Sequence, residues 1–71
     1  MEERDFLALT FEEAVKRAES GTIETTQDHS GYEGPETWVW YDNGLLVRYG
    51  RAYKPQSVQL CGTQVRLWQG R

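Results

Sequence analysis

The spacing of apolar residues changes along this chain, from a helical period near the start to the short runs of a sheet. Between Thr10 and Ser20, apolar residues recur three and four positions apart, which marks one face of an amphipathic helix. Thr10 and Glu13 have the spacing of a capping box, and Gly21 suits a left-handed helix end. We therefore expect a helix over about 10–20. Because a helix this short is not stable alone, it must pack on a sheet.

After this helix, β-branched and aromatic residues form runs of strand length between turn residues. The runs predict strands at about 22–27, 37–42, 45–50, 57–61 and 64–69. The stretch 27–36 is polar, contains glycine and proline and has no period, so we expect a loop there. The chain is thus expected to be a single α+β domain over residues 1–71. It would have one N-terminal helix packed on a small antiparallel sheet or partly open barrel of four to five strands.

The last two strands have a clear predicted register. Gly62-Thr63 suits a type II′ turn, and a two-residue loop there places Leu60 opposite Val65. Val58 then faces Leu67 on the same, apolar side. The pairs expected on the other side are Cys61 with Gln64, Gln59 with Arg66, and Ser57 with Trp68. This separation of apolar from mostly polar pairs is typical of a sheet with one face in the core.

The hairpin around Asn43-Gly44 has two open registers, because both of its faces carry large apolar groups. A two-residue loop places on one face Trp38, Trp40, Leu45, Val47 and Tyr49. A three-residue loop over 42–44, with a glycine bulge, instead groups Val39, Tyr41, Leu45, Val47 and Tyr49, and leaves Trp38 and Trp40 with Leu46 and Arg48. In either register the second face needs a cover, which could be the second hairpin, another copy of the chain or a partner.

Charge is unevenly distributed along the chain, whose formal net charge is −3. Residues 1–36 hold ten acidic and three basic side chains, a formal charge of −7. Residues 37–71 hold one acidic and five basic side chains, a formal charge of +4. The two halves either neutralise each other in the fold or present an acidic and a basic surface to partners.

The sequence contains no arrangement typical of a catalytic or cofactor site. His29 is the only histidine, and its neighbours Asp28 and Ser30 do not make a triad, because triad geometry comes from convergence in space. We expect His29 to be a surface-loop residue and Cys61, the only cysteine, to be a packed or bystander residue rather than a nucleophile. The glycines match no phosphate-binding motif, and nitrogen and sulfur ligands are too few for a metal site. We therefore expect no enzyme activity, no cofactor and no bound metal.

A chain without such motifs is expected to act by binding. The favoured hypothesis is a small non-enzymatic interaction protein that occludes the surface of a protein partner, its carboxylates mimicking nucleic-acid charge. Small acidic inhibitors of host nucleic-acid-handling or defence complexes, encoded by phages and mobile elements, are an analogy in size and charge. The candidate residues of this acidic face are Glu12, Glu13, Glu19, Asp28, Glu33 and Glu36.

The alternative hypothesis is an aromatic and basic β-surface that binds single-stranded nucleic acid or a nucleotide by stacking and charge. The candidate residues of this face are Trp38, Trp40, Arg48, Tyr49, Arg51, Tyr53, Arg66 and Trp68. The acidic net charge argues against it, since nucleic-acid-binding domains are usually basic. The same residue types are enriched at protein interfaces, so a homodimer is a further candidate.

Two sequence features bear on location. The longest apolar runs are far shorter than the roughly 18 residues that span a bilayer. The charged start, Met1 to Asp5, does not fit a signal peptide. We expect a cytoplasmic protein without membrane contact.

Overall fold

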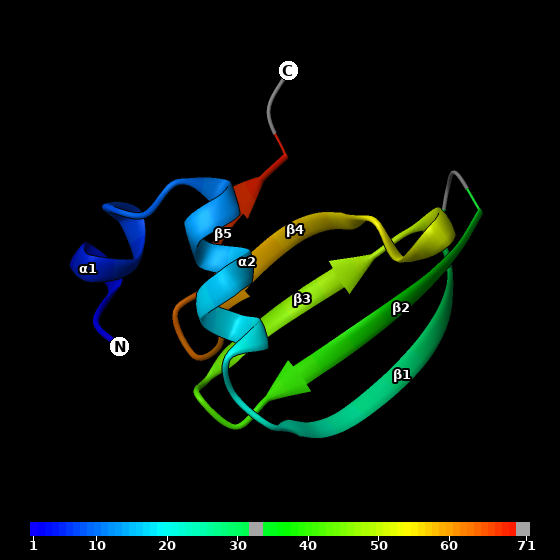
Figure 1. The fold of residues 1–71 in the computed structure, drawn as a ribbon, viewed down its shortest axis with the longest axis horizontal. Coiled ribbons are helices and arrows are strands. Elements are labelled where there is room, and N and C mark those ends of the chain that lie inside the picture. Colours follow the sequence, from blue (N-terminus) through cyan, green and yellow to red (C-terminus); the bar gives the residue numbers. More distant parts are fainter. Residues whose placement is uncertain (32–33, 70–71) are drawn as a thin grey trace.

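The computed structural model describes residues 1–31 and 34–69, which form an α+β fold (Figure 1). Its helices are α1 (Glu3–Leu7), α2 (Phe11–Glu19) and the 3₁₀ turn η1 (Arg51–Tyr53). Its strands are β1 (Ile23–Gly31), β2 (Gly34–Tyr41), β3 (Leu45–Tyr49), β4 (Pro55–Leu60) and β5 (Val65–Trp68). The predicted class is confirmed: a helix near the N-terminus packs on an antiparallel sheet.

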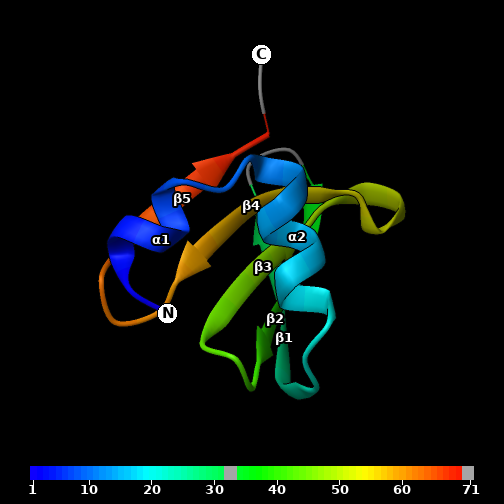
Figure 2. The same cartoon turned by 60° about the vertical axis from the view of Figure 1, so that its left-hand side comes forward.

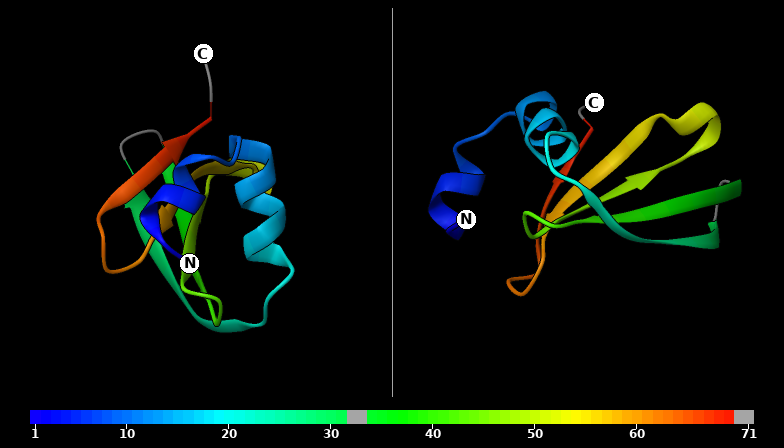
Figure 3. Two further views of the ribbon diagram at one scale, coloured as in Figure 1. Left: turned by 90° about the vertical axis from the view of Figure 1, so that its left-hand side faces the viewer. Right: turned by 60° about the horizontal axis from the view of Figure 1, so that its bottom comes forward.

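The sheet has the strand order β1-β2-β3-β4-β5, and every neighbouring pair is antiparallel. Over the described residues the five strands form a twisted, open sheet, not a closed barrel (Figure 3). Of the two architectures that the sequence left open, the open sheet is therefore the one observed. Its two faces are consequently separate surfaces.

Helix α2 covers one of these faces (Figure 2). The predicted capping box is present: Glu13 N donates to Thr10 Oγ1 at 3.1 Å, and Thr10 N donates to Glu13 Oε1 at 2.8 Å. Ala14, Val15 and Ala18 point into the core, and α2 contacts β3, β4 and β5. Helix α1 was not predicted from the sequence, and it adds the fully buried Phe6 to the same core.

The predicted loop over 27–36 is wrong for its described residues. Gln27–Gly31 belong to β1 and Gly34–Glu36 belong to β2, with His29 opposite Glu36 in the register. The polar composition of this stretch fits a strand because β1 is at the sheet edge, and most of its side chains are exposed. Apolar periodicity does not detect such a strand.

The hairpin between β2 and β3 takes the three-residue loop, with Val39 opposite Val47 and Trp40 opposite Leu46. Gly44 has the positive φ of 85° that this bulged turn requires. The turn also binds the end of α2, since Asn43 Nδ2 donates to the carbonyl oxygens of Arg17 at 2.8 Å and Ala18 at 3.3 Å. These are carbonyls that a helix end leaves unpaired. The turn thus fixes both the register and the position of the helix.

The β4–β5 hairpin has the predicted register, with Leu60 opposite Val65 and Ser57 opposite Trp68. Its turn is longer than predicted, because Cys61–Gln64 lie outside the ladder. Gln64 takes a φ of 65°, so the expected Cys61–Gln64 pair does not form. The separation of the two faces is unaffected.

Candidate aromatic and basic binding surface

The face of the sheet turned away from α2 carries Trp and Arg side chains from three strands. Strand alternation and the observed registers place Trp38 and Trp40 on this side of β2, Arg48 on β3, and Arg66 and Trp68 on β5. We call these five residues the aromatic–basic face. The three-residue loop at Asp42–Gly44 decides this arrangement, because a two-residue loop would have turned both tryptophans of β2 toward the helix.

Arg48 is at the centre of this face. Its guanidinium carbon lies 4.8 Å from the ring centre of Trp38 and 5.8 Å from that of Trp68, on opposite sides. Its Nη2 also donates to both carboxylate oxygens of Glu36, at 3.0 and 3.3 Å. The arginine therefore links the two tryptophans across the strands between them, through cation–π contacts and one ion pair.

Glu36 is held ionised by the same group of residues. Trp38 Nε1 donates to Glu36 Oε1 at 3.0 Å, and this hydrogen bond, followed by those from Arg48, holds the pKa of Glu36 below its usual value. The Glu36 side chain is about four-fifths buried. Glu36 therefore orients Trp38 and Arg48, and the positive charge of Arg48 balances its negative charge.

His29 extends the aromatic row onto the edge strand. Its ring stacks on Trp38 with centroids 4.0 Å apart, and its Nε2 lies 2.9 Å from Gln27 Oε1. His29 was not predicted to belong to this face, because residue 29 was expected in a loop and lies instead on β1. A signal was nevertheless present in the sequence: glycines at positions 31 and 34 favour antiparallel pairing of the segments before and after them, which places residue 29 beside the strand of Trp38.

Trp40 on β2 and Arg66 on β5 belong to the neighbouring row of cross-strand positions on the same face. Arg66 lies 5.6 Å from the ring centre of Trp68, and its Nε donates to Gln59 at 3.1 Å. Trp40 lies 6.1 Å from Trp38, with the rings tilted. The cations and rings of the face are therefore held by one another before any ligand arrives.

These side chains cover the sheet beneath them. Leu46 and Ser57 lie on the same face, yet they are only 5% and 0% exposed. The second apolar face was expected to need a cover. The long side chains of the face itself supply much of that cover. Trp68 nevertheless keeps 58% of its surface exposed, so its ring remains accessible.

A pocket of about 400 Å³ adjoins this face where β2 begins and β3 ends. Within residues 1–31 and 34–69, the basic residues that line it are Arg48, Arg51 and Lys54, and the acidic one is Glu36. The ring of Trp68 forms part of its wall. The remaining lining residues are Gly34, Pro35, Gly50 and Gln56.

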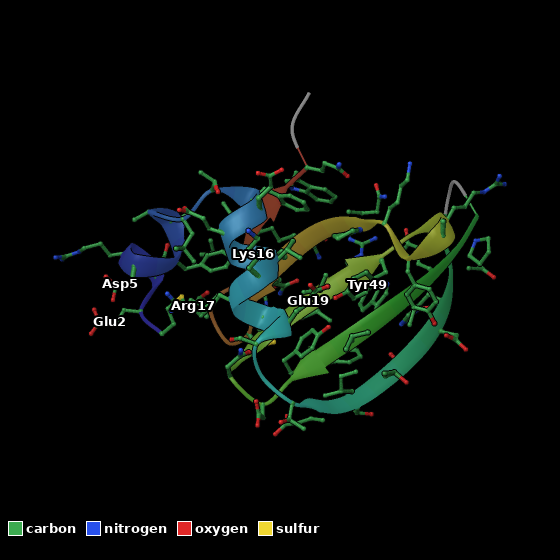
Figure 4. All side chains as sticks on the ribbon, in the orientation of Figure 1. Glu2, Asp5, Lys16, Arg17, Glu19 and Tyr49 are labelled. Carbon is green, nitrogen blue, oxygen red and sulfur yellow. The ribbon has the colours of Figure 1, made fainter. Side chains whose placement is uncertain are left out.

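Two residues expected on the aromatic and basic face lie elsewhere. Tyr49 is buried on the helix side, where its hydroxyl lies 2.7 Å from that of Tyr41 and donates to Glu19 Oε2 at 2.7 Å (Figure 4). Burial, followed by these hydrogen bonds, raises the pKa of Tyr49 well above its usual value. Tyr53 packs against Tyr49, with centroids 5.9 Å apart, and is 68% exposed.

The expected acidic face is divided by the fold. Glu12, Glu13 and Glu19 lie on α2, whereas Glu36 lies on the opposite side of the sheet. Asp28 is on edge strand β1, where it accepts a hydrogen bond from Thr37 at 3.4 Å. Glu33 falls outside the described residues. The three α2 glutamates are therefore the part of this set that shares one element.

Three further findings concern metal binding, membrane spans and similarity to known proteins. Among the described residues, histidine, cysteine and carboxylate side chains do not gather in threes close enough to hold a metal ion. The helices in the described ranges are too short and too polar to cross a bilayer. Comparison of the chain with protein-family models, with curated proteins and with solved structures finds no match.

Proposed function

We propose that this protein is a non-enzymatic binding protein whose aromatic–basic face binds single-stranded nucleic acid. The observation that carries the proposal is the row of Trp38, Arg48 and Trp68, in which rings and a guanidinium alternate across the sheet. β-Surfaces bind single strands with rings that stack on bases and cations that contact phosphates. Trp68 is the exposed ring of this row, whereas Trp38 is half-buried. This row is assembled in advance, so binding would require little further ordering.

The acidic net charge does not oppose this proposal, because the carboxylates are mostly placed elsewhere. Glu3 and Asp5 lie on α1, and Glu12, Glu13 and Glu19 lie on α2, on the other side of the sheet. Glu36, beside the row, is paired with Arg48, and Glu24 lies near Trp40 at the edge strand. A strand on the aromatic–basic face would therefore meet mainly rings and guanidinium groups.

The proposal is tested with a fluorescently labelled short oligothymidylate, whose anisotropy reports binding to the protein. We expect binding at low salt that weakens as salt is added, since phosphate contacts release counterions. Trp68→Ala should weaken binding about 5- to 150-fold, the effect of losing one stacked base. Ile23→Ala is the matched control, because Ile23 is similarly exposed, at 55%, but lies on β1 opposite Tyr41, outside the aromatic–basic face. No binding at low salt, or equal losses in the two variants, would refute the proposal.

A second candidate function uses the helix side and a protein partner. A shallow groove of about 690 Å³ lies between α2 and the β4–β5 region. Two carboxylates, Glu12 and Glu19, and one ammonium group, Lys16, line it together with Phe11 and Val15. Its carboxylates and apolar groups suit a basic, partly apolar segment of another protein, as expected of an occluding inhibitor. If this surface functions, Glu12→Lys should abolish the capture of a stoichiometric partner from lysate. Glu2→Lys, an equal charge change away from the groove, should not.

A further inference from the structure

We infer that the pocket beside Trp68 binds a terminal phosphate, a phosphate monoester, of a nucleotide whose base stacks on the Trp68 ring. This inference rests on the proposed function, because it names which part of a nucleic acid this part of the aromatic–basic face would recognise. Three features carry it: the charge of the pocket, the geometry of its basic loop and its position next to an exposed ring.

Among the described residues, those lining the pocket have an excess of positive charge. Glu36 and Arg48 form an ion pair, whereas Arg51 and Lys54 form none within residues 1–31 and 34–69. Two cations therefore face the pocket without a carboxylate partner in that part of the chain. A phosphate monoester carries about −1.5 to −2 charges at neutral pH, which matches two cations better than the single charge of an internal phosphodiester does.

The segment from Gly50 to Lys54 holds both cations at this pocket. Gly50 N donates to the Lys54 carbonyl at 2.8 Å, and Lys54 N donates to the Arg51 carbonyl at 3.1 Å, so the loop is closed at its base. Ala52 and Tyr53 between them have positive φ values of 56° and 54°. Arg51 extends toward the start of β2, where a Cβ on Gly34 would lie 3.6 Å from its Nε. The two cations come from the same closed loop.

The pocket is bordered by a surface suited to a base. Trp68 lines the pocket and is 58% exposed, so its ring can accept a stacked base next to the cations. The pocket volume of about 400 Å³ is within the range of small-ligand sites. The pocket lies alongside the Trp38–Arg48–Trp68 row, next to η1, because its lining includes both Arg48 and Trp68.

The experiment compares ligands that differ only in a phosphate. Isothermal titration with thymidine 5′-monophosphate and with thymidine measures the preference in a mononucleotide. Oligothymidylates with 5′-phosphate, 3′-phosphate or two hydroxyl ends measure it in a strand. We expect at least one phosphorylated end to bind about tenfold more tightly than the hydroxyl end, as for hydrogen bonds to a charged group.

Arg51→Gln should remove most of that preference, and Lys54→Gln provides a second, independent variant of the same loop. Arg17→Gln is the matched control, because Arg17 is an exposed arginine on α2 and does not line the pocket. Circular dichroism of each variant confirms folding. An equal loss of preference in Arg51→Gln and Arg17→Gln would overturn the inference.

The outcomes separate this inference from the proposed function. If all oligothymidylates bind equally and Trp68→Ala weakens them, the phosphate site is refuted and the proposed function stands. If thymidine 5′-monophosphate binds with the expected preference but oligothymidylates do not bind, the pocket is supported and strand binding is refuted. If none of the ligands binds, both are refuted.

Discussion

The two faces of this sheet are buried in different ways. The helix face holds aliphatic and tyrosine side chains under α2, and its Leu45, Val47 and Val58 are fully buried. The aromatic–basic face has no such layer over it, yet Leu46 and Ser57 there are also nearly inaccessible. Long amphipathic side chains lying on a sheet can therefore replace a second layer, while their rings and charges stay partly exposed. On the aromatic–basic face, the same side chains that shield Leu46 and Ser57 are themselves partly accessible to solvent.

The largest expected effect comes from the neighbouring residues Leu45 and Leu46, which point to opposite faces. Leu45→Ala should lower the free energy of unfolding by about 3–5 kcal/mol, since α2 and the strands cannot easily close the cavity. Leu46→Ala should cost about 2 kcal/mol, because the side chains above it can collapse into the space. Urea unfolding of both variants measures the difference. A domain of this size has a total stability of only about 4–10 kcal/mol, so Leu45→Ala should be close to unfolding.

Equal losses in these two variants would contradict the comparison. They would mean that the aromatic–basic face is packed as rigidly as the helical core. A larger loss in Leu46→Ala than in Leu45→Ala would mean that the aromatic–basic face is packed more rigidly than the helix face.

The next largest effect concerns the arginine at the centre of the aromatic–basic face. Arg48→Gln should destabilise the fold by about 1–3 kcal/mol, because it removes cation–π contacts and leaves the carboxylate of Glu36 without its ion pair. Arg66→Gln is the matched change, and for this exposed arginine we expect a loss of about 0.5 kcal/mol or less. Urea unfolding compares the two. Similar losses in the two variants would show that Arg48 stabilises the aromatic–basic face no more than Arg66 does.

High pH should affect the helix face through Tyr49. Its pKa is raised by burial and by hydrogen bonds with Tyr41 and Glu19, so the fold favours the neutral phenol. This contribution to stability is present below the usual tyrosine pKa of about 10 and is lost as the pH rises above it. Urea midpoints measured at neutral and alkaline pH should fall more in the native chain than in Tyr49→Phe. Parallel curves for the two proteins would contradict the expected burial of this hydroxyl.

Low pH should affect the aromatic–basic face through Glu36, and here we expect the smallest effect. Its pKa is lowered by hydrogen bonds from Trp38 and Arg48, so the fold favours the carboxylate. The contribution is present above the usual value of 4.5 and is lost as the pH falls below it. Glu36→Gln keeps the size and an acceptor for Trp38 but removes this dependence. Stability measured across this acidic range should therefore decline less steeply in the variant, and an unchanged slope would argue against the Glu36–Arg48 pair.

The sequence predicted those parts of the fold that depend on local chemistry. The capping box at Thr10 and Glu13 and the register around Leu60 and Val65 needed only neighbouring residues, and both are confirmed. The choice between the two Asn43 registers needed a distant contact, because the Asn43 side chain binds carbonyls at the end of α2. Helix α1 was missed for a similar reason, since Phe6 gains its burial from the core and not from its own turn.

The candidate site was predictable in composition but not in arrangement. The Trp and Arg types were visible in the sequence, whereas the place of Tyr49 among them depended on which register the hairpin took. Glu36 was grouped with the acidic residues because charge alone does not show that Arg48 lies across the strand pair. His29 was missed because a polar edge strand leaves no apolar period.

The strand order β1-β2-β3-β4-β5 has a consequence for how the chain reaches this structure. Every strand pairs with its neighbour in sequence, so each pairing closes only a short loop and loses little chain entropy. The contacts of α2 with β4 and β5 span a much longer stretch of chain. We therefore expect the meander to assemble hairpin by hairpin, with the closing of the long loop between α2 and β4 as the slow step of folding.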